Sequence, residues 1–367
     1  MRRARTRPSR APRATRTFVS LTGPAGNIGD ALIRRETLAW ATGTSDELVA
    51  YTGESPDVWL TQLGLPDETI VLRTKKSVPR WLWLLATAPR RPMLVFEAGE
   101  IPLGRGNGLR EIVFLAETLL VRLKGGIVVR PPRGIRGSSW PAIAIHRLAA
   151  RLSQVTLWRD ASTKATARSG RLAPDIGFSA GTRAGLGWEE RTELVVSLRG
   201  ARPLPDAEWL RAVRESAERA GLRIRTVVQV REDEDRAREL AHLLGAEFEP
   251  WGDTDPLVQE ERLRQRYGAA QIVISDRMHV LVLAALSGAV PVELVPRPTA
   301  KIADAFAAIG LDGVSFDASG IDPTRVREVL RPSPERAAEV SERVRSAEAK
   351  LAGIEQGIRT AVRRVRA

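Results

Sequence analysis

Short apolar runs alternate with amphipathic helical patterns along most of this chain, and this alternation constrains the fold more than any other feature. Such alternation is typical of stacked strand–helix–strand units, which build a mainly parallel sheet covered by helices. In the first half, strands are expected at residues 18–21, 68–72, 93–96, 127–130 and 154–158, and helices at 31–41 and 111–124. In the second half, strands are expected at 194–198, 223–230, 247–248, 271–275 and 290–295, and helices at 206–220, 233–244, 256–267 and 278–286.

Each half opens with its own strand, so the sequence predicts an α/β protein with two Rossmann-like domains facing a cleft. The 367 residues agree with two domains at the usual ~150 residues each. The expected divisions are a disordered basic tail at 1–16, an N-terminal domain at 17–170, a C-terminal domain at 171–330 and a C-terminal amphipathic helix at 331–367. Ligands of such sheets bind beyond the carboxyl ends of the strands, so the loops after strands are where chemistry is expected.

Composition excludes several classes of protein. The chain has no cysteine, which rules out disulfides, thiolate nucleophiles and cysteine-bound metals and is compatible with the cytoplasm. The net charge is +13, but seven arginines and no acidic residue lie within the first sixteen positions. The rest of the chain is therefore only mildly basic, which argues against a nucleic-acid binder. The tail lacks the apolar core of a secretory signal, and no stretch is apolar enough to span a bilayer.

The first candidate motif is Gly26-Asn27-Ile28-Gly29-Asp30, which follows the first expected strand and opens a helix. Glycines allow a tight turn and close approach to a ligand, and the helix N-terminus presents free N–H groups to an anion. A plain glycine turn with Asp30 as the helix cap explains the same residues. The spacing matches neither a dinucleotide fingerprint nor a P-loop.

The second candidate motif is Ser275-Asp276-Arg277-Met278-His279, at another junction from strand to helix. Arginine offers a planar fork to phosphate or carboxylate, and histidine exchanges a proton near neutral pH. The alternative is a capping cluster in which Asp276 binds helix N–H groups and His279 is simply half-buried. The functional interpretation is favoured, because His279 is the best placed of only three histidines.

Further cations stand at the ends of expected strands. Arg159 and Arg199 each close a strand, and Lys301 falls where a helix should begin after residues 290–295. Each is weak evidence alone in a chain this rich in arginine. Asp175, between the two halves, fits a linker turn.

Taken in order, these motifs resemble the polysaccharide pyruvyl transferase family. The resemblance covers about residues 17–310 and rests on the Gly-Asn-x-Gly-Asp motif, Arg159-Asp160, Pro174-Asp175 with Phe178, Ser197-Leu198-Arg199, and the Arg-x-His segment at 277–279. It implies a glycosyltransferase-B-like fold with phosphoenolpyruvate as co-substrate. No further cofactor is expected, and the sequence shows no cluster of metal ligands. It also implies a transferase that places pyruvate, as a ketal, on a sugar of a cell-surface polysaccharide or of its lipid-linked precursor.

The resemblance places Arg277, His279, Arg199 and Lys301 at the donor, and the roles of the other residues follow from their chemistry and position. The expected catalytic residues are His279 and Asp30. The donor would be bound by Arg199, Arg277 and Lys301, and the acceptor or its loops would involve Gly26, Asn27, Gly29, Glu100 and Arg159.

Rival interpretations stay open. One is a nucleotide-sugar glycosyltransferase of the same architecture, for which Glu293 would bind the ribose, and another is an inactive binding relative. Peripheral contact with the inner face of the membrane is a further expectation, since Trp81 and Trp83 lie near arginines in residues 78–91. For that segment itself an amphipathic core helix is the favoured interpretation.

Overall fold

The computed structural model describes residues 15–183, 186–320 and 322–366. The expected basic tail lies outside this part of the chain except for its last two residues. Of these, Arg16 already belongs to the first strand, so the tail as predicted is one residue too long at this end.

The first half forms a parallel sheet in the order β3-β2-β1-β4-β6-β7-β8, with β5 paired to β6. Its strands are β1 (Arg16–Ser20), β2 (Glu47–Tyr51), β3 (Ile70–Leu72), β4 (Met93–Val95), β5 (Gly99–Pro102), β6 (Ile127–Arg136), β7 (Val155–Trp158) and β8 (Arg171–Leu172). Its α-helices are α1 (Ile28–Ala41), α2 (Asp57–Leu63), α3 (Val78–Thr87), α4 (Gly108–Leu123), α5 (Trp140–Leu152) and α6 (Ala161–Ala167). A short 3-10 helix, η3 (Ile176–Ser179), follows in the link to the second half.

The second half forms another parallel sheet in the order β11-β10-β9-β12-β13-β14. Its strands are β9 (Glu193–Ser197), β10 (Arg223–Val227), β11 (Glu247–Glu249), β12 (Ala270–Ser275), β13 (Val290–Val295) and β14 (Ser315–Asp317). The α-helices are α7 (Ala207–Ala220), α8 (Glu234–Leu244), α9 (Pro256–Ala269), α10 (Met278–Leu286), α11 (Ala300–Ala307), α12 (Pro323–Val329) and α13 (Pro334–Arg366). The α/β class with two Rossmann-like domains is confirmed.

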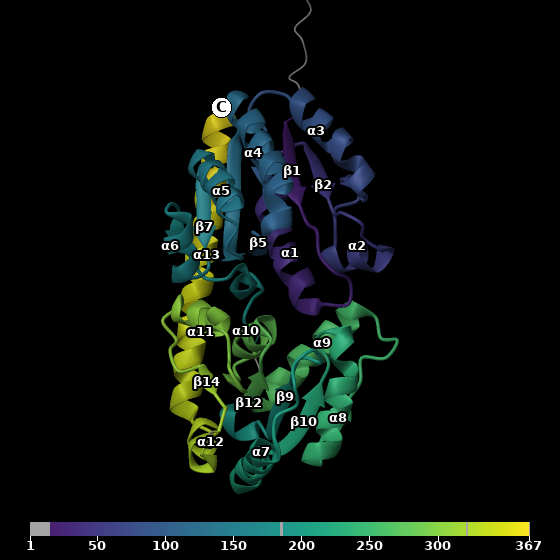
Figure 1. Cartoon of the computed structure of the whole chain (residues 1–367). Coiled ribbons are helices and arrows are strands. Elements are labelled where there is room, and N and C mark those ends of the chain that lie inside the picture. Colours follow the sequence, from purple (N-terminus) through teal and green to yellow (C-terminus); the bar gives the residue numbers. More distant parts are fainter. Residues whose placement is uncertain (1–14, 184–185, 321, 367) are drawn as a thin grey trace, which may run out of the picture.

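Figure 1 shows the two domains one above the other, with α13 running along both. This last helix returns to the first domain, where the Arg359 guanidinium donates to the carbonyls of Thr42 and Ala39. Its apolar residues Val340, Val344 and Leu351 are buried in a core cluster that contains residues of both domains. The two domains therefore share a continuous apolar contact beside the cleft.

The strand expected at residues 127–130 is longer than predicted and continues to Arg136. Residues 131–137 contain two prolines and two glycines, a composition typical of a loop. Pairing with β7 shifts register between Arg130 and Arg133, which is where the prolines stand. Proline is tolerated in a strand at such an irregularity because no ladder hydrogen bond is needed from its nitrogen. The extension carries β6 to β5 and to the cleft.

Candidate active site

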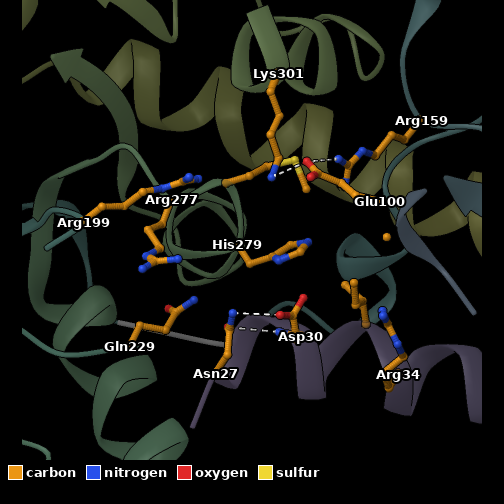
Figure 2. Close-up of a pocket in the computed structure, with 13 residues that line it drawn as sticks. Asn27, Asp30, Arg34, Glu100, Arg159, Arg199, Gln229, Arg277, His279 and Lys301 are labelled. Carbon is orange, nitrogen blue, oxygen red and sulfur yellow. Dashed lines mark hydrogen bonds and ion pairs between the residues drawn. The ribbon is translucent and has the colours of Figure 1, made fainter. Parts of the chain in front are cut away.

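A cavity of about 350 Å³ lies between the two domains, beyond the carboxyl ends of the strands of both sheets. Figure 2 shows α1 below it and α10 behind it. It is lined by Asn27, Asp30, Ile33, Arg34, Gly99, Glu100, Arg159, Arg199, Gln229, Arg277, Met278, His279 and Lys301. Eight of the ten predicted site residues are thus brought together. The exceptions are Gly26 and Gly29, which shape the wall without lining it.

The loop before α1 places its side chains by short-range hydrogen bonds. Gly26 has φ +80, which favours glycine, and the chain then turns into the helix. Asn27, rather than Asp30, caps the helix: its Oδ1 accepts from the Asp30 N–H at 3.2 Å. Asn27 Nδ2 in turn donates to Asp30 Oδ2 at 2.8 Å. The predicted capping role of Asp30 is therefore wrong, and its carboxylate is held at the cavity instead (Figure 2).

Gly29 explains how closely the two domains approach. A Cβ at this position would lie 2.5 Å from the Cβ of His279 on α10. Any side chain would therefore push α1 and α10 apart. The absence of one lets the first turn of α1 pack against the catalytic candidate His279.

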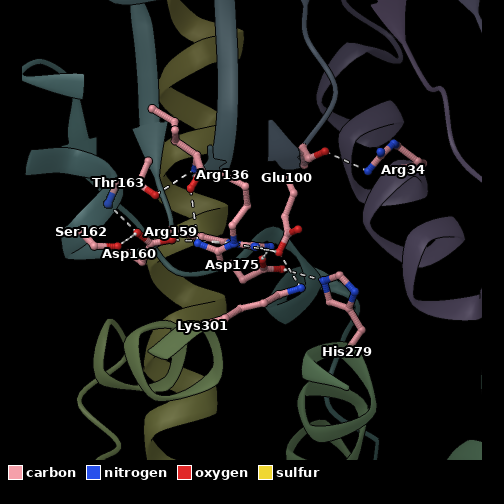
Figure 3. Close-up of polar contacts among 12 residues, drawn as sticks. Arg34, Glu100, Arg136, Arg159, Asp160, Ser162, Thr163, Asp175, His279 and Lys301 are labelled. Carbon is pink, nitrogen blue, oxygen red and sulfur yellow. Dashed lines mark hydrogen bonds and ion pairs between the residues drawn. The ribbon is translucent and has the colours of Figure 1, made fainter. Parts of the chain in front are cut away.

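His279 belongs to a chain of charged groups that crosses the cleft (Figure 3). Its Nε2 lies 3.7 Å from Asp175 Oδ1, and its side chain is 13% exposed. Asp175 Oδ2 accepts from Arg159 Nη1 at 3.2 Å, and its Oδ1 accepts from the Gly177 N–H. Burial by itself raises the pKa of Asp175, but His279 and Arg159 outweigh this and lower it. A buried carboxylate this close to an imidazole restricts the orientation of the ring.

Asp175 is a site residue that the sequence analysis does not include. The interpretation of its segment as a linker turn is incomplete, because η3 packs between α1 and α10. The only signal in the sequence is its place within the Pro174-Asp175 motif.

Glu100 of β5 links the two domains. Its Oε1 lies 2.6 Å from Lys301 Nζ and 3.0 Å from Arg159 Nη2. Burial by itself raises the pKa of Glu100, but Lys301, Arg159 and Arg136 together lower it to about 2. Burial and Arg159 lower the pKa of Lys301, whereas Glu100 opposes that shift. Glu100 is therefore an ionised anchor for cations and a poor proton acceptor. Lys301 falls at the start of α11, as predicted.

Arg277 differs from its expected geometry. Its Nε and Nη2 donate to Asp233 at 2.6 and 2.8 Å. The guanidinium expected to bind a ligand through two hydrogen bonds therefore already makes them to a carboxylate. Within the described residues, Nη1 makes no hydrogen bond and is the group left for a ligand. No sequence pattern points to this pair, since the partners lie 44 residues apart.

Arg199 is held by Asp276, the residue before Arg277. The Arg199 N–H donates to Asp276 Oδ1 at 2.9 Å, and its Nε lies 3.7 Å from Asp276 Oδ2. Arg202 shares the same carboxylate at 3.2 Å. The alternative of Asp276 as a helix cap is therefore wrong, because α10 begins without a side-chain cap. Asp276 positions the Arg199 guanidinium at the cavity.

Sequence reasoning missed Arg34 and Gln229. Arg34 is buried in α1, where its Nε donates to the Thr22 carbonyl and its Nη1 to the Ala98 carbonyl. An arginine within the apolar stripe of a helix is a usable signal. Gln229 follows β10, and its Oε1 accepts from the buried Tyr267 hydroxyl at 3.0 Å.

The cavity offers cations rather than a metal centre or a base-stacking surface. In the described residues, no group of three or more carboxylate or histidine side chains is arranged to hold a metal ion. No phenylalanine, tyrosine or tryptophan is among the residues that line the cavity in this part of the chain. Glu293, the expected ribose ligand of the rival hypothesis, is fully buried in β13 and accepts from the Ser315 hydroxyl.

Comparison with known proteins supports the fold. No family model matches the chain, and no curated protein matches its sequence. Among solved structures, HepE of Anabaena in complex with UDP is similar over 95% of this chain and 99% of its own, with 12% identity and a TM-score of 0.57. MnaA of S. aureus in complex with UDP is similar over 92% of this chain and 91% of its own, with 12% identity and a TM-score of 0.55.

The chain has the glycosyltransferase-B fold. At 12% identity, the similarity is one of fold, which is the arrangement of the two domains. In that arrangement, the cavity of this chain occupies the cleft between them. Within the described residues, no helix combines the length and the apolar character needed to cross a bilayer.

Proposed function

We propose that this protein transfers a pyruvyl group from phosphoenolpyruvate to a sugar of a cell-surface polysaccharide or of its precursor. The observation that carries the proposal is the set of cationic side chains contributed by both domains to one small cavity: Arg34, Arg159, Arg199, Arg277 and Lys301. Its volume of about 350 Å³ is at the lower end of the ~300–1,000 Å³ usual for ligand sites. Phosphoenolpyruvate is compact and carries both a phosphate and a carboxylate, so it needs such a set.

The cations of the C-terminal domain suit the donor. Arg277 is the N-cap of α10, and Arg199, which follows β9, is joined to the same region through Asp276; both line the cavity. Lys301 reaches the same cavity from α11. Hydrogen bonds between charged groups are the strongest available for phosphate and carboxylate oxygens. We assign the phosphate and carboxylate to these three side chains, with Asp233 and Asp276 keeping the two arginines in place.

His279 is assigned the proton transfer to the donor. A proton from its imidazolium would go to the methylene carbon, which becomes a methyl group and leaves positive charge at the neighbouring carbon. A sugar hydroxyl attacks that carbon, the bond to phosphate breaks, and a second hydroxyl closes the ketal. One hydroxyl proton passes through the base to the departing phosphate, and the other restores His279. Asp175, which lies 3.7 Å from His279 Nε2, orients the ring for the first step.

Asp30 is assigned the acceptor hydroxyl. It faces the cavity from α1 on the side opposite Lys301, and Asn27 fixes its carboxylate (Figure 2). Glu100 is less suited to accept a proton because its pKa is lowered to about 2 by its cations once burial has been outweighed. The base and the acid would thus come from different domains.

A nucleotide-sugar glycosyltransferase is the second candidate, and the structural comparisons favour it over pyruvyl transfer. HepE is in complex with UDP or with UDP-glucose, and MnaA with UDP. The composition of the site supports the first candidate instead. A nucleotide would need contacts for its base and ribose, and Glu293 is fully buried and does not line the cavity.

A thermal-shift comparison tests the proposal, because a ligand that binds the folded state raises its melting temperature. Phosphoenolpyruvate should raise the melting temperature of the wild type, and UDP and UDP-glucose should not. Lys301→Met should weaken the response by about tenfold in ligand concentration, the effect of losing one charge-assisted contact. The matched control is Lys164→Met on the exposed side of α6, which should respond as the wild type does. A response to UDP alone would favour the second candidate.

A further inference from the structure

Exposed apolar side chains are concentrated on one layer of helices in the N-terminal domain. Eleven large apolar side chains are exposed in the described residues, and seven of them lie on α3, α4 and α5. These are Trp83, Leu109, Ile112, Leu119, Leu123, Trp140 and Leu148. The three helices pack side by side, α3 on α4 and α4 on α5, as seen in Figure 1. We call the outer face of this layer the α3–α5 face.

The apolar positions of α4 form a regular outward stripe. Leu109, Ile112, Ala116, Leu119 and Leu123 are exposed at alternating spacings of three and four residues, which places them on one side of a helix. Leu109 is 74% exposed and Leu123 is 85% exposed. The opposite side of α4 buries Glu117, Thr118 and Val121 against the sheet. The helix is therefore apolar on the side that has no partner in the described structure.

The same face carries cations and no accessible carboxylate. From Arg80 to Arg159 there are only four acidic residues, and Glu111 and Glu117 are buried. Glu111 Oε2 lies 2.7 Å from His146 Nδ1, and Glu117 accepts from Trp81 Nε1 at 2.8 Å.

The other two acids lie at the cleft end of the sheet. Glu97 accepts from the Ser20 hydroxyl, and Glu100 pairs with Lys301. The exposed charged residues on the three helices are therefore Arg80, Arg122 and Arg151, and the exposed Arg90, Arg91 and Arg105 lie between α3 and α4 in the sequence.

We propose that the α3–α5 face binds the surface of an anionic lipid bilayer. Tryptophan and leucine side chains among arginines enter the boundary between headgroups and acyl chains, and anionic lipids attract the surrounding cations. A second copy of the chain would bring two positively charged faces together, which disfavours self-association through this surface. The α4 part of the face begins at Leu109, nine residues after Glu100, so we expect a membrane-bound protein to hold its cleft near the headgroups.

This proposal reconciles the two interpretations of residues 78–91. Trp81 is buried and packs on Phe18 at 5.3 Å between ring centroids. Trp83, two residues later, is 62% exposed. One helix thus supplies both a core residue and a surface residue. The proposal does not depend on the identity of the donor.

Flotation of the full chain with lipid vesicles tests the proposal. Vesicles of phosphatidylcholine with one-third phosphatidylglycerol should bind the protein, and pure phosphatidylcholine vesicles should bind it about tenfold or more weakly. The double variant Leu109→Glu with Leu123→Glu should reduce binding to the anionic vesicles by about tenfold or more. Leu257→Glu with Val258→Glu is the matched control, because these residues are exposed on α9 of the other domain. It should bind as the wild type does.

Several results would overturn the proposal. These are equal binding by both double variants, no binding to anionic vesicles at low salt, or loss of binding only when residues 2–15 are deleted. A dimer in light scattering without lipid, abolished by the Leu109 and Leu123 substitutions, would assign the face to self-association. If the Leu109→Glu with Leu123→Glu variant has a lowered melting temperature, quenching of tryptophan fluorescence by brominated lipid replaces flotation of that variant as the test. Trp83→Phe with Trp140→Phe should then remove most of the quenching, and unchanged quenching would contradict the proposal.

Discussion

Replacing Gly29 by alanine tests the contact on which the geometry of the cleft depends. The new Cβ would lie 2.5 Å from His279 Cβ, where ordinary contacts begin at 3.4 Å, so the overlap is 0.9 Å (3.4 less 2.5). Both atoms sit directly on backbone, so rotating a side chain cannot relieve the overlap. We expect α1 and α10 to separate by about this amount, at a cost of about 1–3 kcal/mol, as for other overpacked cores. The shift would also move His279 relative to Asp175.

Chemical unfolding and donor titration of the same samples measure the two effects. Gly29→Ala should lower the free energy of unfolding by about 1–3 kcal/mol and weaken phosphoenolpyruvate binding. Gly357→Ala is the matched control, because this glycine lies within α13 with nothing within 4 Å of the added Cβ. It should raise stability by about 0.5–1 kcal/mol, since alanine is the better helix former. Wild-type stability and binding in Gly29→Ala would refute the contact between the helices.

Three further substitutions give distinct readouts. His279→Ala should lower turnover by about 10² or more with the fold intact, and near-normal rates on any acceptor that supports the wild type would remove His279 from catalysis. Burial raises the pKa of Glu36 to about 7 although Arg35 and Arg264 oppose this, so its contribution to stability declines as pH rises from 4.5 through 7. Glu36→Gln should therefore stabilise the protein at pH 8 by about 1–3 kcal/mol in chemical unfolding, and an equal gain at pH 4 would contradict this origin. Burial raises the pKa of Glu100, but Lys301 and other cations outweigh this and lower it to about 2. Glu100 therefore contributes stability above pH 4.5, and this contribution is lost as pH falls toward 2. Glu100→Gln should flatten the unfolding profile in that window, and an unchanged profile would show that the ion pair is unimportant.

The parts of the fold predicted from the sequence are those in which burial fixes composition. Strands of a parallel sheet covered on both faces are continuous apolar runs, so β9, β12 and β13 can be recognised from their residues alone. Shorter or more polar strands lack this signal. In β5, Gly99–Pro102, buried and exposed residues alternate over only four positions, and two of the four are glycine and proline.

The candidate site is predictable where a motif follows a strand directly. The carboxyl ends of parallel strands meet at one edge of each sheet. The positions of Asp30, Arg199 and His279 in the sequence are therefore enough to place them together at the cleft. Asp175 and Asp233 cannot be placed in this way. Asp175 lies in the link between domains, and Asp233 reaches Arg277 from the segment after β10. Their roles depend on packing between elements far apart in the sequence.

Calorimetric titration of the purified protein tests the central claim most directly, since it needs no acceptor. Phosphoenolpyruvate should bind at a single site, inorganic phosphate should compete with it, and UDP-glucose should give no heat of binding. Arg199→Lys should weaken the titration, because lysine keeps the charge and loses the planar fork. Tight binding of UDP or UDP-glucose with no detectable binding of phosphoenolpyruvate would contradict pyruvyl transfer and leave the nucleotide-sugar glycosyltransferase as the function of this cleft.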